Sequence, residues 1–152
     1  MTVTIVGREH IRLPKTLGEC DSFSIERREV PLQCHTGRDL GEIWRGIPVA
    51  DLITAASMPE DTTHLLVTGD GDYRMCVELR DAFECLLAYE CDGDPVGDDQ
   101  GTTRLVGPGI DSTHSVKAVR RIEGIHLEPT DDPTELETYE LTPNSETATR
   151  SR

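Results

Sequence analysis

The stretch from Val30 to Pro48 places a cysteine and the only tryptophan of the chain between a strand pattern and a helix pattern. Apolar alternation over residues 22–30 predicts a strand, and Cys34 follows where this alternation stops. Behind Pro48, apolar residues recur at helical spacing and predict a helix over residues 48–57. We therefore expect the Cys34 thiol at the end of a strand, on a loop that leads to a helix. A thiol in such a place can serve as a ligand or a nucleophile, whereas apolar burial would keep it protonated.

The length of 152 residues suits one domain with one core. From residue 129 the composition changes to Thr, Pro, Glu and Ser, so we expect a domain over residues 1–128 and an acidic, flexible tail over residues 129–152. No apolar run approaches the roughly 18 residues that a membrane span needs, and the N-terminus lacks the basic-then-apolar order of a signal peptide. These features predict a cytoplasmic protein without a membrane span.

The charge balance is strongly acidic, with 29 Asp and Glu against 15 Lys and Arg, and only Lys15 and Lys117 are lysines. Such a surface is typical of proteins adapted to high salt, where the screening length falls to about 3 Å and self-repulsion weakens. The alternative is an ordinary acidic protein. No basic stripe exists to meet phosphates, so the charge pattern excludes nucleic acid as a partner.

Five cysteines form no Cys-x-x-Cys pair, which disfavours both a zinc site and a disulfide framework. Reduced thiols in a cytoplasm fit this count better. Cys76, Cys85 and Cys91 fall within or beside apolar runs, so we expect them in the core.

The middle of the chain reads as a series of short strands. Residues 64–68 form an apolar run, a turn signal follows at residues 69–72, and alternating residues 73–79 return from it, which together predict a hairpin. Residues 80–84 predict a helical turn, and residues 86–91 another strand. With the strand expected over residues 2–7, the pattern predicts an α+β fold with a mixed sheet and a few short helices.

A second polar region begins after Gly107-Pro108-Gly109, where two glycines allow close approach of the backbone. Residues 110–123 concentrate hydroxyl groups, a histidine, a lysine and arginines at the start of an ordered element. Successive backbone N–H groups flanked by cations predict an anion site, in which Arg104 offers two parallel donors and Lys117 a point charge. The alternative is that these cations form structural ion pairs.

Several segments, in this order, resemble the molybdopterin-binding domain of the sulfite oxidase family over roughly residues 30 to 125. The first is Cys34 followed by Trp44-x-Gly46-x-Pro48. The others are Gly71-Asp72-Tyr73, Leu79-Arg80-Asp81-Ala82, Leu86-Leu87-Ala88-Tyr89-Glu90-Cys91-Asp92-Gly93-Asp94-Pro95, Arg104-Leu105-Val106-Gly107-Pro108-Gly109 and Ser115-Val116-Lys117-Ala118-Val119-Arg120-Arg121-Ile122-Glu123.

The resemblance implies a molybdenum–molybdopterin cofactor and oxygen-atom transfer on a small oxyanion or sulfoxide, with a separate electron-transfer partner. It makes Cys34 the catalytic thiolate and the metal ligand, a role that suits soft sulfur donors. The cofactor's pterin and phosphate are then held by residues from the back half of the chain and one strand end, namely Arg104, Ser115, Val116 through its backbone, Lys117 and Thr68.

Departures from the family pattern leave two other functions open. Asp99 stands where the family has Asn or His, and only 33 residues precede Cys34, fewer than the family has there. A shortened, cofactor-free relative acting as a binding or structural module is therefore the main alternative. The other is a thiol enzyme with Cys34 as nucleophile and His35 as base. His114 either contacts the phosphate or caps its turn.

Overall fold

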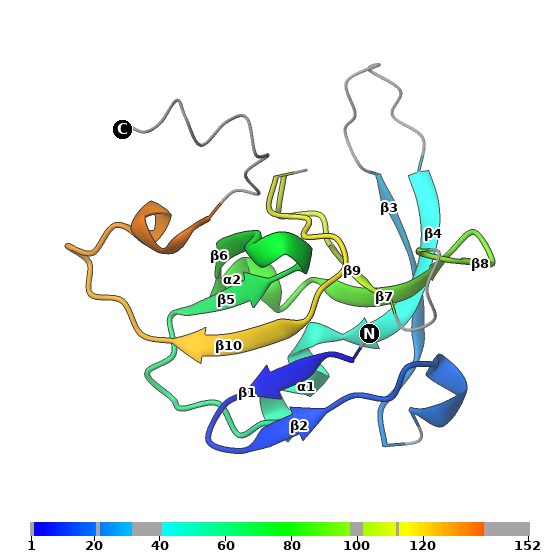
Figure 1. Cartoon of the computed structure of the whole chain (residues 1–152), viewed down its shortest axis with the longest axis horizontal. Helices are drawn as coiled ribbons and strands as arrows, with labels where there is room; N and C mark the ends of the chain where they lie inside the picture. The colour runs from blue at the N-terminus through cyan, green and yellow to red at the C-terminus, as the bar shows by residue number, and fades with distance from the viewer. Residues whose placement is uncertain (1, 21, 32–40, 98–101, 112, 139–152) are drawn as a thin grey trace.

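The computed structural model describes residues 2–20, 22–31, 41–97, 102–111 and 113–138, and they form two five-stranded sheets with a few short helices (Figure 1). The first sheet is mixed, because β1 runs parallel to β10 while the other neighbours are antiparallel. In spatial order, it contains β2 (His10–Arg12), β1 (Thr4–Val6), β10 (Arg121–Ile125), β5 (His64–Thr68) and β6 (Arg74–Glu78).

The second sheet is antiparallel and carries the regions singled out in the sequence. β7 pairs with both β4 and β9, so this sheet contains strands from the first and the second half of the sequence. Its strands are β3 (Glu26–Pro31), β4 (Gly41–Pro48), β7 (Leu86–Cys91), β8 (Asp94–Pro95) and β9 (Arg104–Val106).

The helices are short. α1 (Val49–Ala55) has seven residues, and among the described residues no helix has the length and apolar character needed to cross a bilayer. The remaining helical segments are α2 (Leu79–Ala82) and the 3-10 turns η1 (Leu17–Glu19), η2 (Asp70–Asp72) and η3 (Pro133–Leu136).

The main core lies between the sheets and α1. It combines side chains such as Ile5 and Val67 from the first sheet with Ile47 and Leu87 from the second, and Leu52 from α1. Burial of these apolar side chains is the largest favourable contribution to folding.

A smaller apolar cluster centres on Trp44, on strand β4, and also contains Val30, Leu86, Ala88 and Val106. Alternate residues of β4 therefore face different surroundings, with Trp44 buried and Ile43 exposed. This alternation is the period-2 pattern of a strand in a sheet.

Most expectations about the elements are confirmed. The strands at residues 64–68 and 86–91, the hairpin formed by β5 and β6, and the helix after Pro48 are all present. The α+β class is confirmed as well, although the strands form two sheets. Of the thiols expected in the core, Cys76 and Cys85 are buried, whereas Cys91 is partly exposed at the edge of the Trp44 cluster.

One expectation was wrong. The segment before α1 is not a loop but strand β4, which pairs with β3 on one side and β7 on the other. Gly46 permits the second pairing, because a Cβ there would collide with the backbone carbonyl of Leu87 and lie 2.7 Å from the Ala88 Cα. The strand therefore depends on its neighbours rather than on its own propensity.

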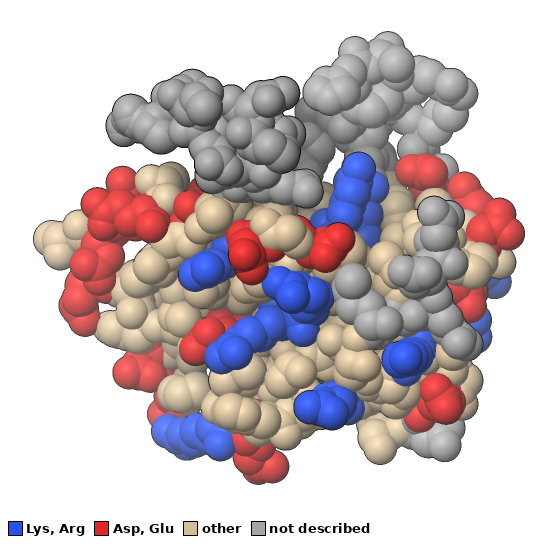
Figure 2. Space-filling view, viewed as in Figure 1, with Lys and Arg blue, Asp and Glu red and all other residues tan. Residues whose placement is uncertain are grey.

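The surface charge is uneven. Figure 2 shows Lys and Arg side chains gathered across the middle of one face, with Asp and Glu concentrated toward its edges. Of the predicted tail, the structure describes residues 129–138, and Thr138 pairs with Arg74 at the free edge of β6.

A candidate anion site beside a tryptophan

The region predicted to hold an anion is built from two segments that pair with each other. The Leu105 N–H donates to the Val116 carbonyl at 3.0 Å, and the Val119 N–H donates to the Thr103 carbonyl at 3.2 Å. This pairing sets Arg104 opposite Lys117. Two cations that are 13 residues apart in the sequence thus pair at one end of the second sheet.

Arg104 is held in a fixed orientation. Its Nε–H donates to the Ser115 hydroxyl at 3.0 Å, and its guanidinium carbon lies 5.9 Å from the centroid of the Trp44 ring, within cation–π range. Among the described residues, its two terminal nitrogens have no hydrogen-bond or ion-pair partner. Burial lowers the pKa of Arg104, although Glu42 and Cys91 oppose this, and a guanidinium remains charged in proteins. The Arg104 guanidinium, which we call the fork, is therefore a partly buried cation whose two terminal nitrogens can still donate hydrogen bonds to a ligand.

Ser115 orients Arg104. The side chain is 2% exposed, and its hydroxyl donates to the Leu105 carbonyl at 2.5 Å while accepting from Arg104. Val116 is buried, and its N–H donates to the His114 carbonyl at 2.9 Å, so that donor is engaged within the turn. Lys117 is exposed. These three neighbouring residues therefore differ in role: Ser115 orients Arg104, the Val116 N–H is used within the turn, and Lys117 is exposed.

Thr68 is brought to the same place by the turn that follows β5. Gly69 lies against the anion turn, where a Cβ would be 2.5 Å from the Lys117 carbonyl oxygen and 2.7 Å from Val116 Cγ1. Thr68 precedes this glycine, and its carbonyl accepts from the Arg120 N–H at 2.8 Å. Thr68 is therefore one residue from the close contact between Gly69 and the anion turn.

Sequence reasoning missed two further residues at this end of the molecule. Trp44 supports Arg104, and its indole N–H is buried with no acceptor among the described residues. Arg120 donates from Nε to the Gly69 carbonyl at 3.0 Å and lies 3.4 Å from Asp72. Nothing local in the sequence indicates the Trp44–Arg104 contact, because the two residues belong to separate strands.

The predicted metal ligand Cys34, its neighbour His35 and the departing residue Asp99 lie outside the described residues. Their flanking strand is described. β3 and β4 pair up to Pro31 and Gly41, and Trp44 follows on β4. The strand that continues from the cysteine segment therefore supports the guanidinium of the anion site.

Another group of metal-ligating types lies nearby. Single ligand atoms of Glu42, Cys91 and Asp92 lie within 4.8 Å of one another. Burial, with a contribution from Glu42, raises the pKa of the Cys91 thiol to about 12, so the thiol is protonated at neutral pH. The Asp92 carboxylate already accepts the Ile43 N–H at 3.0 Å. The contacts that these residues make with each other and with the backbone account for their closeness.

Ser115→Ala is expected to destabilise the protein by about 1–3 kcal/mol, because it leaves the Leu105 carbonyl and the Nε–H of Arg104 without their shared partner. Urea unfolding of the full chain measures this loss. The exposed Ser24 provides the control, since Ser24→Ala should change stability by no more than about 0.5 kcal/mol. Equal effects of the two substitutions would show that the Ser115 hydroxyl does not hold the site together.

Comparisons with known proteins support the fold and the family. A family model described as oxidoreductase molybdopterin binding domain matches residues 11–132. Among solved structures, the fold is similar to the sulfane dehydrogenase SoxCD from Paracoccus pantotrophus, with a TM-score of 0.69 and 16% sequence identity. The match covers 86% of this chain but 39% of the other chain. The search of curated proteins returns no match.

Proposed function

The chain belongs to the oxidoreductase molybdopterin binding domain family, and we propose that it is a molybdenum-cofactor-binding module of the sulfite oxidase type. The observation that carries this proposal is the arrangement of Arg104, whose charged fork is fixed by Ser115 and Trp44 while its terminal donors face no described partner. Lys117 stands opposite. A fixed guanidinium with a lysine opposite it is suited to bind a ligand that ends in a phosphate.

The donors present fit such a group. A phosphate has only acceptor oxygens and a negative charge, and the Arg104 fork offers two parallel N–H bonds to it. Lys117 adds an exposed ammonium, and Thr68, directly before Gly69, is proposed to add a hydroxyl. Ser115 acts indirectly by fixing the guanidinium. A preordered fork loses less conformational entropy on binding than a free arginine side chain.

Cys34 is the proposed metal ligand because the family resemblance implies it, and the environments of three other thiols oppose ionisation. Burial raises the pKa of Cys76 to about 11 and those of Cys85 and Cys91 to about 12, with nearby carboxylates adding to the effect. When bound, the molybdenum cofactor supplies oxygen-atom transfer, and the protein supplies orientation and electrostatics. A thiolate at Cys34 suits this metal because soft metals prefer sulfur donors.

The proposed substrate is a small oxyanion or a sulfoxide, with electrons passing to a separate partner protein. The chain spans 39% of the length of the matched SoxCD chain, so these assignments rest on the family and not on that protein. The acidic composition, with 29 Asp and Glu against 15 Lys and Arg, supports a setting at high salt, and we propose a cytoplasmic location. The cofactor-free alternative is not favoured by the comparisons.

Cys34→Ser is expected to abolish molybdenum binding and leave the fold intact, because a neutral hydroxyl replaces the thiolate ligand. Elemental analysis of the full chain, purified from a host that makes the cofactor, measures the metal. Circular dichroism checks the fold. Cys91→Ser is the matched control and should keep its metal. Unchanged molybdenum content in the Cys34 variant would refute the ligand role, and loss of metal in the control alone would move that role to the other cysteine.

A further inference from the structure

Residues 132–138, which we call the strap, close the free edge of β6. The Arg74 N–H donates to the Thr138 carbonyl at 2.6 Å, and the Thr138 N–H returns a bond to Arg74 at 2.8 Å. Two residues further along β6, the Cys76 N–H donates to the Glu137 carboxylate at 3.1 Å. A side chain therefore takes the place of a strand carbonyl there. Figure 1 shows this segment in orange beside β5 and β6.

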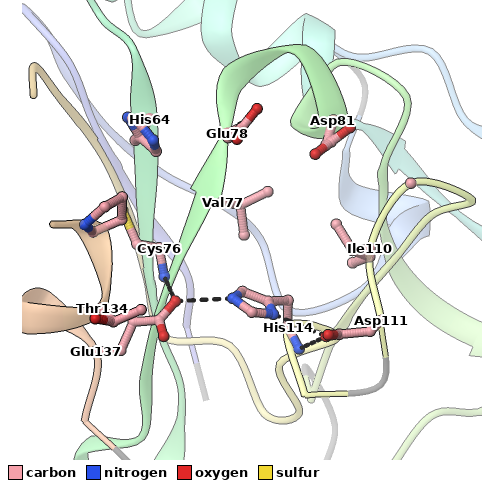
Figure 3. A pocket seen from close by; sticks show the side chains of 12 residues that line it. His64, Cys76, Val77, Glu78, Asp81, Ile110, Asp111, His114, Thr134 and Glu137 are labelled. Carbon is pink, nitrogen blue, oxygen red and sulfur yellow. Dashed lines mark hydrogen bonds and ion pairs between the residues drawn. The ribbon is translucent and has the colours of Figure 1, made fainter. Parts of the chain in front are cut away.

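The same Glu137 carboxylate holds His114. Its Oε2 lies 2.8 Å from the Nε2 atom of His114, while Nδ1 of that ring lies 2.8 Å from Asp111 Oδ1 (Figure 3). Ionised carboxylates only accept hydrogen bonds, so both ring nitrogens must carry a proton for both contacts to form. A neutral ring would turn a lone pair toward one of the two carboxylates. With both carboxylates ionised, the two contacts are those of an imidazolium.

His114 also belongs to the turn that carries the anion site. Its backbone N–H donates to Asp111 Oδ1 at 2.9 Å, and the next N–H, of Ser115, donates to the Asp111 carbonyl at 3.1 Å. The carbonyl of His114 then accepts the Val116 N–H. The ring that the strap holds is thus one residue from the hydroxyl that orients Arg104.

We propose that His114 is a positioning residue, whose imidazolium closes the strap on β6 and locks the turn of Ser115 and Lys117 in its anion-binding form. Loss of a ring proton leaves Glu137 or Asp111 without its hydrogen bond from His114, which loosens the strap or the turn and weakens the anion site. The inference rests on the proposed function, because it concerns the same anion site. It gives the strap a role in regulating cofactor retention.

The surroundings favour the imidazolium. Burial by itself lowers the pKa of His114, but the hydrogen bonds to Asp111 and Glu137 outweigh it, and the pKa rises above its ordinary 6.5. The stabilisation from a raised pKa is fully present below the unfolded value and is lost as the pH rises through the folded value. The contribution of His114 to closure of the strap is therefore full below about pH 6.5 and is lost as the pH rises through the raised pKa of His114.

Other titratable groups face His114 across a cavity of 310 Å³. Among the described residues that line it, none is a lysine or an arginine, and the Cys76 thiol stays protonated because burial and Glu137 raise its pKa to about 11. Carboxylates therefore dominate the field at the ring. The facing groups are His64 from β5, Cys76 and Glu78 from β6, Asp81 from α2, Asp111 from the turn and Glu137 from the strap.

Glu137→Gln tests the coupling in the full chain. A glutamine oxygen in the place of Oε2 can still accept from the Cys76 N–H, and loss of the carboxylate charge lets His114 deprotonate at lower pH, so closure of the strap should depend little on pH. Glu135→Gln, an exposed residue of the same strap, is the control for the lost charge. Imidazole nitrogen chemical shifts report the titration of His114, and hydrogen exchange at Arg74 and Thr138 reports closure.

Sulfate is the probe for the anion site, because its charge does not change in this pH range. In the unaltered protein, sulfate affinity measured from the Ser115 and Lys117 amide shifts should fall at least about fivefold between about pH 6 and about pH 9, the low end of usual coupling between sites. The Glu137→Gln variant should lose less than about twofold, and its His114 should titrate at lower pH.

The outcomes separate this inference from the function on which it rests. A constant sulfate affinity while His114 titrates would overturn the coupling and leave the anion site intact. No sulfate binding at any pH would count against the anion site itself, and exchange at Ser115 and Lys117 would then decide the coupling. Exchange at these amides that is independent of His114 protonation would reject it. Equal behaviour of the Glu135→Gln and Glu137→Gln variants would also reject it.

Discussion

Arg104→Gln is expected to lower the affinity of the anion site for sulfate at least about tenfold, the equivalent of one charge-assisted hydrogen bond. The substitution removes the charge and both terminal donors of the fork, while glutamine still covers part of the Trp44 ring. Arg104→Lys should give an intermediate loss, because it keeps a charge but not the paired geometry. Amide shifts of Lys117 during sulfate titration measure these affinities.

Arg80→Gln is the matched control for Arg104→Gln. Arg80 is an exposed arginine whose side chain is 84% accessible and whose partner is Glu78 on the surface. Surface pairs of this kind contribute little, so sulfate affinity should be unchanged. An Arg104 variant that binds sulfate as tightly as this control would show that the held guanidinium is a structural cation only.

Gly46→Ala is expected to destabilise the fold by about 3 kcal/mol or more, a large share of a typical domain's stability. The added Cβ would collide with the Leu87 carbonyl, which is backbone and cannot move aside as a side chain would. Relief requires separation of β4 from β7, and this separation would also displace Trp44 from Arg104. Urea unfolding and near-ultraviolet dichroism of the tryptophan report both effects.

Gly18→Ala is the control for the change of residue type. A Cβ at Gly18 would have no atom within 4 Å, so this variant should be close to neutral. If the two alanine variants had the same midpoint of unfolding, the close approach of β4 and β7 would not limit stability.

The sequence predicted the elements whose signals are local. Strand β5, its turn and β6 follow from an apolar run, a Gly-Asp cluster and an alternating return, and the structure contains them with nearly the expected bounds. The anion site remains a prediction. The structure pairs Arg104 with Lys117 and bonds Arg104 to Ser115, so part of the predicted set is brought together.

The parts that were missed depend on contacts between distant segments. Strand β4 begins with a glycine, contains another at Gly46 and ends with Pro48, residues that are depleted in strands. It forms because two neighbouring strands pair with it. No periodic pattern in the sequence indicates that Trp44 contacts Arg104 or that Glu137 contacts His114, because the partners in each pair belong to different elements.

We propose that this chain holds molybdopterin through the anion site at Arg104. The most direct test is the joint content of molybdenum and pterin in the full chain, purified from a host that makes the cofactor, beside the Arg104→Gln variant. We predict equimolar metal and pterin in the unaltered protein and loss of both in the variant. A folded, unaltered protein that carries neither, or a variant that retains both in full, would contradict the account.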